Sequence, residues 1–102
     1  MNPTIKEKLQ HEKEHYAKEG FCILGVFGSY ARDEETKDSD IDILYELDSK
    51  FIQNHLGFTA FSRLSTIKDE LKNSFGVDVD IAAKSGLSKT GKKYILKELQ
   101  SV

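Results

Sequence analysis

Residues 21–47, FCILGVFGSYARDEETKDSDIDILYEL, decide how this chain folds. The first apolar run, FCILGVF at 21–27, is continuous between Gly20 and Gly28, which predicts a strand covered on both faces near the centre of a sheet. The second run, DIDILYEL at 40–47, alternates between apolar and polar side chains and predicts a second strand. One face of that second strand is apolar and consists of Ile41, Ile43 and Tyr45.

Helical periodicity flanks these two strands on both sides. Residues 4–19 carry a thin apolar stripe that ends at Gly20, which predicts a charged helix. The stripe consists of Ile5, Leu9, Tyr16 and Ala17. Residues 58–75 have apolar side chains every three or four positions and are followed by Gly76, which predicts a second helix. Its apolar positions, expected in the core rather than on a base-stacking surface, are Phe58, Phe61, Leu64, Ile67, Leu71 and Phe75.

The last part of the chain adds one strand and one helix. VDVDIAA at 77–83 alternates and predicts a third strand. Ser88 is suited to cap a final helix that carries Tyr94, Ile95 and Leu99. The resulting order of elements predicts an α/β (α+β) fold, with helices packed against a small mixed β-sheet. Because no linker or repeat interrupts the pattern, we expect residues 1–102 to form a single domain.

Composition limits the classes of function. The 102 residues carry a formal net charge of -2 at pH 7, and we expect no direct nucleic-acid binding, since phosphate neutralisation needs clustered excess Lys and Arg. No apolar run is long enough to span a bilayer, and the charged N-terminal residues lack the apolar core of a signal peptide. We therefore expect a cytoplasmic protein without a membrane partner. The single cysteine, Cys22, is expected to be a small core residue.

Gly28 and Ser29 follow the first predicted strand directly. Two small residues at this point let backbone N–H groups approach a ligand closely, and a helix beginning at Ser29 would add an anion site at its end. The arrangement outlines a phosphate cradle. The simpler alternative is a helix cap after a strand.

Asp40 and Asp42 are two residues apart on the second predicted strand. Their carboxylates therefore project from one face, with backbone positions roughly 6.5 Å apart. Carboxylates together with substrate phosphates are the ligands that Mg²⁺ prefers, although a solvated strand end is the alternative for an isolated Asp-x-Asp. If the strand at 77–83 pairs beside this one, Asp80 or Asp78 can complete a carboxylate triad. Such a triad opposite a phosphate-binding turn suggests nucleotidyl or phosphoryl transfer.

Gly28-Ser29, ten intervening residues and Asp40-x-Asp42 resemble the signature of the DNA polymerase β-like nucleotidyltransferase superfamily. More narrowly, FGSYAR followed by DSDIDIL is similar to the minimal nucleotidyltransferase antitoxins of HEPN/MNT toxin–antitoxin modules. VDIAAKSGL resembles the strand that carries the third carboxylate, and YILKELQSV the closing helix and short strand. On this alignment Asp80, and not Asp78, takes the third carboxylate position.

The resemblance implies roles for seven residues. The carboxylates that hold Mg²⁺ and carry catalysis are Asp40, Asp42 and Asp80, the last of which also helps to activate the acceptor hydroxyl. The residues that bind the nucleotide are Gly28, Ser29, Arg32 and Ser39. Arg32 matches a basic residue after the turn, with an exposed Arg paired to Asp33 or Glu34 as the alternative. Ser39 matches the small residue before the Asp pair, where capping of the strand is a sufficient role.

Two positions depart from the family pattern. Tyr30 stands where Arg is common, and Asp33 stands where Gly is common. We expect the acidic stretch DEETKD at 33–38 to weaken nucleotide affinity or to alter the loop. Neither departure removes a metal ligand.

The resemblance further implies an antitoxin that transfers AMP from ATP, with Mg²⁺, to a tyrosine hydroxyl of a partner HEPN ribonuclease toxin. A chain this short leaves little room for its own acceptor-recognition domain, which also favours a macromolecular acceptor and a hetero-oligomer. Two alternatives stay open. One is a non-catalytic antitoxin that binds the toxin stoichiometrically, and the other is a nucleotidyltransferase that acts on a small molecule or an RNA end.

Two further patterns carry little weight. HEKEH at 11–15 matches the H-E-x-x-H spacing of zinc proteases, but only His55 remains as a further histidine, and the surrounding residues read as a solvated charged face. A group of lysines near the C-terminus is expected to be solvated rather than to bind phosphate. These are Lys84, Lys89, Lys92 and Lys93.

Overall fold

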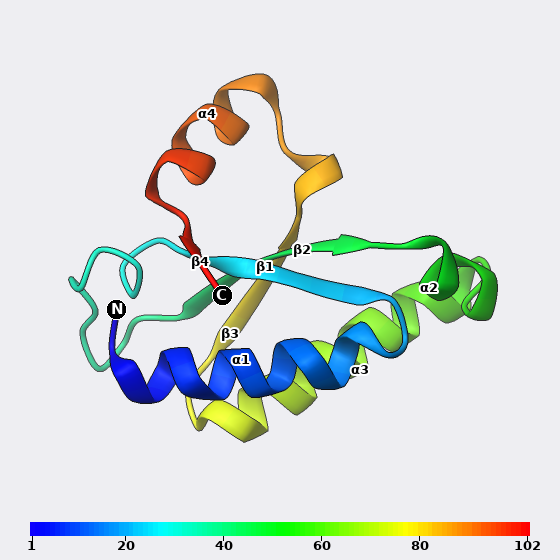
Figure 1. Cartoon of the computed structure of the whole chain (residues 1–102), viewed down its shortest axis with the longest axis horizontal. Helices are drawn as coiled ribbons and strands as arrows, with labels where there is room; N and C mark the ends of the chain where they lie inside the picture. The colour runs from blue at the N-terminus through cyan, green and yellow to red at the C-terminus, as the bar shows by residue number, and fades with distance from the viewer.

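The computed structural model describes all residues of the chain, 1–102, as one mixed sheet with helices on both sides. The elements are α1 (Pro3–Ala17), β1 (Phe21–Phe27), β2 (Ile41–Leu47), α2 (Ser49–Asn54), α3 (Phe58–Phe75), β3 (Val79–Ala83), the 3₁₀ turn η1 (Lys84–Gly86), α4 (Lys89–Glu98) and β4 (Gln100–Ser101). The strand order is β3-β2-β1-β4, with β2 and β3 parallel and the other pairs antiparallel. Helices α1 and α3 cover one face of the sheet, and α4 lies over the other (Figure 1). The predicted α/β fold with a mixed sheet is confirmed.

The core lies between the sheet and the pair α1 and α3. Ile41 and Ile43 of β2 are fully buried there, as the alternation of this strand predicts. Leu9 of α1 and Ile67 of α3 are also fully buried. Each such side chain contributes about 1.5–3 kcal/mol relative to an exposed one. The packing fixes which face of β2 turns away from the helices, and that face carries Asp42.

The two faces of β1 are unequally covered, which contradicts the expectation of a strand buried on both. Phe21, Ile23 and Val26 are fully buried, whereas Cys22 and Leu24 are half-buried. The reason is that α4, which covers this second face, contains no buried residue. Cys22 is therefore not the core residue that the sequence suggested.

A β-bulge at Leu24 interrupts the pairing of β1 with β2. Ile23 pairs with Tyr45 and Gly25 with Leu44, so one extra residue stands on β1. Beyond the bulge, Val26 takes the buried face and Phe27 pairs with Asp42. Because a bulge redirects the side chains that follow it, the end of β1 and the turn after it lie beside Asp42.

Helix α3 has the predicted limits, but its first turn does not pack in the core. Phe58 is 89% exposed and Phe61 is 74% exposed, so the expectation that both are core residues is wrong. The core-facing stripe of this end of the helix runs through Ala60 and Leu64. At about 100° per residue, Phe58 lies roughly 120° around the helix from Leu64. A spacing of three or four residues is therefore not enough to place Phe58 and Phe61 on the buried face of the helix.

The remaining boundaries differ from the sequence prediction at few positions. Helix α4 begins after Ser88, whose hydroxyl accepts a hydrogen bond from the Gly91 N–H, as predicted. Strand β3 begins at Val79 rather than at residue 77. Helix α2, capped by the Asp48 carboxylate, was not predicted. None of the helices has both the length and the apolar character needed to cross a membrane.

Candidate active site

The turn after β1 begins at Gly28, whose φ of 78° lies in the left-handed region that favours glycine. A Cβ at this position would collide with the Asp42 carboxylate, so the close approach of turn and strand also requires glycine. The N–H of Arg32 donates to the Gly28 carbonyl at 3.2 Å, and the N–H of Glu34 donates to the Ser29 carbonyl at 2.9 Å. Residues 29–33 thus form tight turns and not the helix considered for Ser29.

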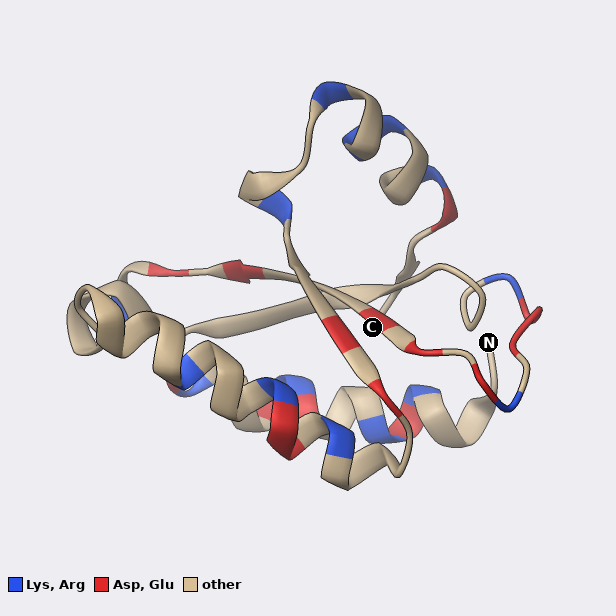
Figure 2. Ribbon diagram, turned by 180° about the vertical axis from the view of Figure 1, so that it is seen from behind, with Lys and Arg blue, Asp and Glu red and all other residues tan.

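The pairing of β2 with β3 brings two carboxylates together. In the parallel register Asp42 is directly opposite Asp80, which is the adjacency that the sequence suggested. Asp40 immediately precedes β2. In Figure 2 the acidic segments of β2 and β3 lie side by side near the middle of the sheet. Asp42, between the buried Ile41 and Ile43, points to the face opposite α1 and α3.

Among Asp40, Asp42 and Asp80, Asp42 is the carboxylate whose charge is disfavoured by its surroundings. Burial raises the pKa of its carboxyl above the usual range, and the charges of Asp80, Asp40 and Glu98 raise it further, while Arg32 acts in the opposite direction. Mutual repulsion of partly desolvated carboxylates is the condition that a bound cation relieves.

Asp80 and Asp78 have different surroundings. Asp80, 57% exposed at its side chain, forms an ion pair with Lys68 at 3.2 Å, and Asp78 forms one with Lys72 at 2.9 Å. Asp78 precedes β3, and its carbonyl accepts a hydrogen bond from the Ile41 N–H at 2.9 Å. Of the two candidates, Asp80 therefore lies beside Asp42, and Asp78 lies nearer the end of α3.

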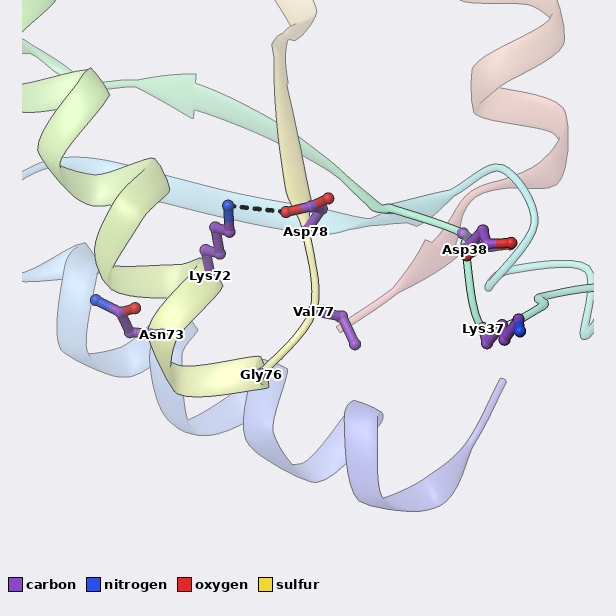
Figure 3. A pocket seen from close by; sticks show the side chains of 8 residues that line it. Lys37, Asp38, Lys72, Asn73, Gly76, Val77 and Asp78 are labelled. Carbon is purple, nitrogen blue, oxygen red and sulfur yellow. Dashed lines mark ion pairs between the residues drawn. The ribbon is translucent and has the colours of Figure 1, made fainter.

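Two hollows adjoin the carboxylates. One of about 370 Å³ contains Asp40 and Asp80 together with Lys68. A larger one of about 510 Å³ lies between the loop at 37–39 and the end of α3, where Figure 3 shows Lys72 paired with Asp78. Neither hollow is lined by Gly28 or Asp42, but the smaller one is lined by Asp80, which pairs directly with Asp42. Geometry and chemistry therefore place the candidate site at the smaller hollow and the Gly28 turn.

Arg32 has two acidic partners. Its Nη1 donates to Glu98 at 2.8 Å and its Nε donates to Glu34 at 3.2 Å. Asp33, the other partner considered from sequence, instead pairs with the N-terminal amine at 2.8 Å. The second oxygen of Glu98 accepts a hydrogen bond from the Gly28 N–H at 2.9 Å.

Glu98 is a site residue that sequence reasoning missed. As the last residue of α4 it falls within KELQ, where a charged side chain at a helix end gives no sign of a partner seventy residues away. The only sequence signal available was the short strand expected after this helix, since that strand returns the chain to β1.

Ser39 supports the loop before Asp40. Its hydroxyl accepts a hydrogen bond from the Thr36 N–H at 2.9 Å, and its own N–H donates to the Thr36 carbonyl at 3.1 Å. These two bonds close the turn at 36–39, just before Asp40. The hydroxyl is thereby occupied within the chain.

The donor set at this site is suited to Mg²⁺, but it is not closed around a cation. No three acidic, His or Cys side chains are grouped as metal ligands. Asp80 forms an ion pair with Lys68, while the partly buried Asp42 is repelled by the charges of Asp80 and Asp40. The residue types fit a divalent cation, with which the Lys68 ammonium would compete for the Asp80 carboxylate. The H-E-x-x-H pattern at 11–15 likewise gathers no third ligand.

A strand ending in a Gly-Ser turn beside a pair of sheet-borne aspartates defines a nucleotidyltransferase, and residues 23–102 match the nucleotidyltransferase domain family. The chain belongs to this family, as the sequence resemblance implied. It is 32% identical to the protein adenylyltransferase MntA of Thermococcus cleftensis, over 87% of this chain and 82% of that protein. A Methanocaldococcus jannaschii protein provisionally assigned the same activity is 34% identical, over 81% of this chain and 78% of its own length.

Solved structures agree with this membership. A structure provisionally described as a minimal nucleotidyltransferase superposes with a TM-score of 0.67 at 30% identity and covers 94% of both chains. A toxin–antitoxin crystal structure with AMP-PNP shares the fold, with a TM-score of 0.66 at 18% identity over 93% of this chain and 69% of that one.

Proposed function

We propose that this protein is an antitoxin adenylyltransferase that transfers AMP from ATP to a tyrosine hydroxyl of a HEPN ribonuclease toxin in the cytoplasm. The observation that carries the proposal is the pairing of Asp42 with Asp80 beside the Gly28 turn. The name of the Thermococcus cleftensis relative, protein adenylyltransferase MntA, supports the choice of adenylyl transfer to a protein. The toxin–antitoxin structure with AMP-PNP supports ATP as the donor and a toxin as the partner.

In this proposal Gly28, Ser29 and Arg32 bind the triphosphate. The small side chains at 28 and 29 leave room for a phosphate beside the turn, and the Arg32 guanidinium lies close to the Gly28 N–H, because both donate to the carboxylate of Glu98. A guanidinium binds phosphate oxygens through parallel, charge-assisted hydrogen bonds. Ser39 keeps Asp40 in place through its bonds to Thr36.

Asp40, Asp42 and Asp80 are the residues that hold Mg²⁺. When bound, the ion neutralises the phosphate oxygens and polarises the α-phosphorus for attack. The structure favours this assignment because burial and neighbouring carboxylates already oppose the charge on Asp42. An ATP–Mg²⁺ complex removes the same repulsion that destabilises the ligand-free site.

The transfer itself breaks one bond and forms one. The tyrosine oxygen of the partner attacks the α-phosphorus of ATP, the bond from that phosphorus to the bridging oxygen breaks, and pyrophosphate leaves. The hydroxyl proton passes to the Asp80 carboxylate, which is exposed enough at the hollow for a macromolecular acceptor to reach. The attacking oxygen must lie in line with the bond that breaks. In this proposal the Gly28 turn positions the triphosphate and Asp80 on β3 positions the hydroxyl, so the alignment depends on the distance between them.

A second candidate function, stoichiometric binding of the toxin without catalysis, is favoured by exposed apolar side chains. All four lie within residues 52–61, which run from α2 to the first turn of α3. They are Ile52, Leu56, Phe58 and Phe61. Such a surface is typical of a protein–protein contact. The two functions separate with Asp42→Ala at equal amounts of antitoxin and toxin, where a catalyst loses protection and a binding plug retains it. At low antitoxin-to-toxin ratios only a catalyst protects at all.

Incubation with the partner toxin, Mg²⁺ and ATP is expected to add one or more AMP units to the toxin. The measurement is the intact mass of both proteins, with each labelled NTP tested in parallel and with EDTA as the control that removes the metal. Modification of the toxin in the presence of Mg²⁺ by ATP, and by none of the other NTPs, supports the proposal. Label on an RNA end or a small molecule supports the third alternative, and protection without any mass change supports stoichiometric binding.

A further inference from the structure

The Glu98 carboxylate occupies the groups to which a phosphate is assigned above. One of its oxygens accepts the Gly28 N–H at 2.9 Å, and the other accepts the Arg32 Nη1–H at 2.8 Å. A carboxylate held by a backbone N–H and a guanidinium has the same partners as a phosphate group would have. The turn thus already binds an anion of its own chain.

Strand pairing explains how a helix residue reaches this turn. Strand β4 pairs with β1 in an antiparallel register that sets Gly25 opposite Ser101 and Val26 opposite Gln100. Because only Leu99 separates Glu98 from β4, this pairing brings the end of α4 to the end of β1. The Glu98 side chain then spans the remaining distance to the Gly28 N–H.

Glu98 is held at this position against two unfavourable charges. It is the last residue of α4, where the helix dipole disfavours a carboxylate. Its charge also adds to the repulsion on Asp42. The Gly28 N–H and then Arg32 compensate, and together they hold the pKa of the Glu98 carboxyl below its usual range. Glu98 is consequently a resident anion at neutral pH.

We propose that Glu98 is an internal competitor of the nucleotide's phosphates for the Gly28 N–H and for Arg32. This inference rests on the proposed function, because it assigns the same two groups to the triphosphate. A bound nucleotide displaces the carboxylate and so releases the end of α4. Because α4 has no buried residue, the contact of Glu98 is one of the main attachments of that helix to the site.

Removing the competitor is expected to tighten nucleotide binding. We expect Glu98→Ala and Glu98→Gln to bind α,β-methylene ATP, which cannot be cleaved at the reacting bond, about tenfold more tightly than the unmodified protein, or ~1.4 kcal/mol. Isothermal titration calorimetry measures the difference. Tripolyphosphate is expected to show the same gain, and adenosine none, since the competition concerns the phosphates. The glutamine variant keeps the size of the side chain and serves if the alanine variant fails to fold.

Glu34 offers a matched control. Its carboxylate also accepts a hydrogen bond from Arg32, at 3.2 Å, but it is 65% exposed and makes no contact with the Gly28 N–H. Glu34→Ala removes one negative charge near the turn without vacating the backbone donor. Its effect on affinity is expected to stay within about twofold, as for exposed ion pairs.

Amide hydrogen exchange gives a second readout. Residues 89–98 are expected to exchange faster when α,β-methylene ATP binds the unmodified protein, and to exchange faster already in ligand-free Glu98→Ala. A merely structural role would speed exchange in the variant but leave it unchanged on nucleotide binding.

Equal or weaker affinity in both Glu98 variants, with measurable binding by the unmodified protein, would overturn the inference and leave the proposed function intact. Weaker affinity would make Glu98 a positioning residue for Arg32. Absence of binding in every variant would overturn the inference and the proposed function together.

Discussion

Asp42→Asn is expected to abolish AMP transfer and, at the same time, to stabilise the ligand-free protein. Transfer should fall by about a thousandfold or more, on the scale seen when one preorganised electrostatic contact to a transition state is lost. Asparagine keeps the shape of the side chain, so the loss reports the missing charge. The measurement is the rate at which the partner gains AMP under saturating ATP and Mg²⁺.

The gain in stability follows from the raised pKa of Asp42. An acid whose pKa is higher in the folded state than in the unfolded state opposes folding when it is charged. Stability of the ligand-free protein should therefore rise as the pH falls through the folded-state pKa of Asp42, and Asn should abolish that contribution. At pH 7 we expect the melting temperature to rise by a few degrees, since 1 kcal/mol corresponds to about 4–8 °C in a domain of this size.

Asp78→Asn is the matched control for this prediction. Asp78 also lies on the polar parity of residues 77–83, but its side chain is exposed and paired with Lys72. We expect transfer within about twofold of the unmodified protein, because exposed ion pairs contribute little. If Asp42→Asn retains transfer, or if Asp78→Asn loses as much, the assignment of the carboxylates is wrong. A lower melting temperature of Asp42→Asn would contradict the electrostatic argument alone.

The parts of the fold that sequence predicted well are those with a local cause. The limits of α3 match because apolar spacing and Gly76 are read within one segment. Strand β1 matches because Gly20 and Gly28 bound a continuous apolar run. Each of these signals needs no knowledge of what packs against the element.

The features that sequence did not predict depend on contacts between distant segments. Phe61 is exposed because tertiary packing selects the stripe of α3 that faces the sheet. The bulge at Leu24 arises from the register between β1 and β2, and periodicity within one strand cannot reveal it. Family resemblance, and not spacing, favoured Asp80 over Asp78.

Glu98 shows the same limit within the candidate site. Its contact with Gly28 requires the antiparallel pairing of the two-residue strand β4 with β1. Seventy positions separate the two residues along the chain. Alternation over so short a strand carries almost no sequence signal.

Gly28→Ala is expected to cost both stability and activity, and comparison with Gly76→Ala separates the two causes. The φ angles are similar, 78° at Gly28 and 72° at Gly76. A Cβ at residue 76 would meet nothing within 4 Å, whereas one at residue 28 would collide with the Asp42 carboxylate. Both variants should therefore lose about 1–2 kcal/mol, because a residue with a Cβ is strained in the left-handed region. Gly28→Ala should lose a further ~1–3 kcal/mol to overpacking.

Activity distinguishes the variants more sharply. The new methyl group at residue 28 must displace either the turn or the Asp42 carboxylate that lies against it. A misplacement of about 1 Å can lower the rate about a hundredfold. Gly76→Ala leaves the turn and Asp42 untouched, so its transfer rate should be unchanged below its melting temperature. Urea titration measures the stability of each variant. The rate of transfer is measured as the gain in the toxin's intact mass over time. Equal activity in the two variants would mean that the close approach of the turn to Asp42 is not needed for transfer.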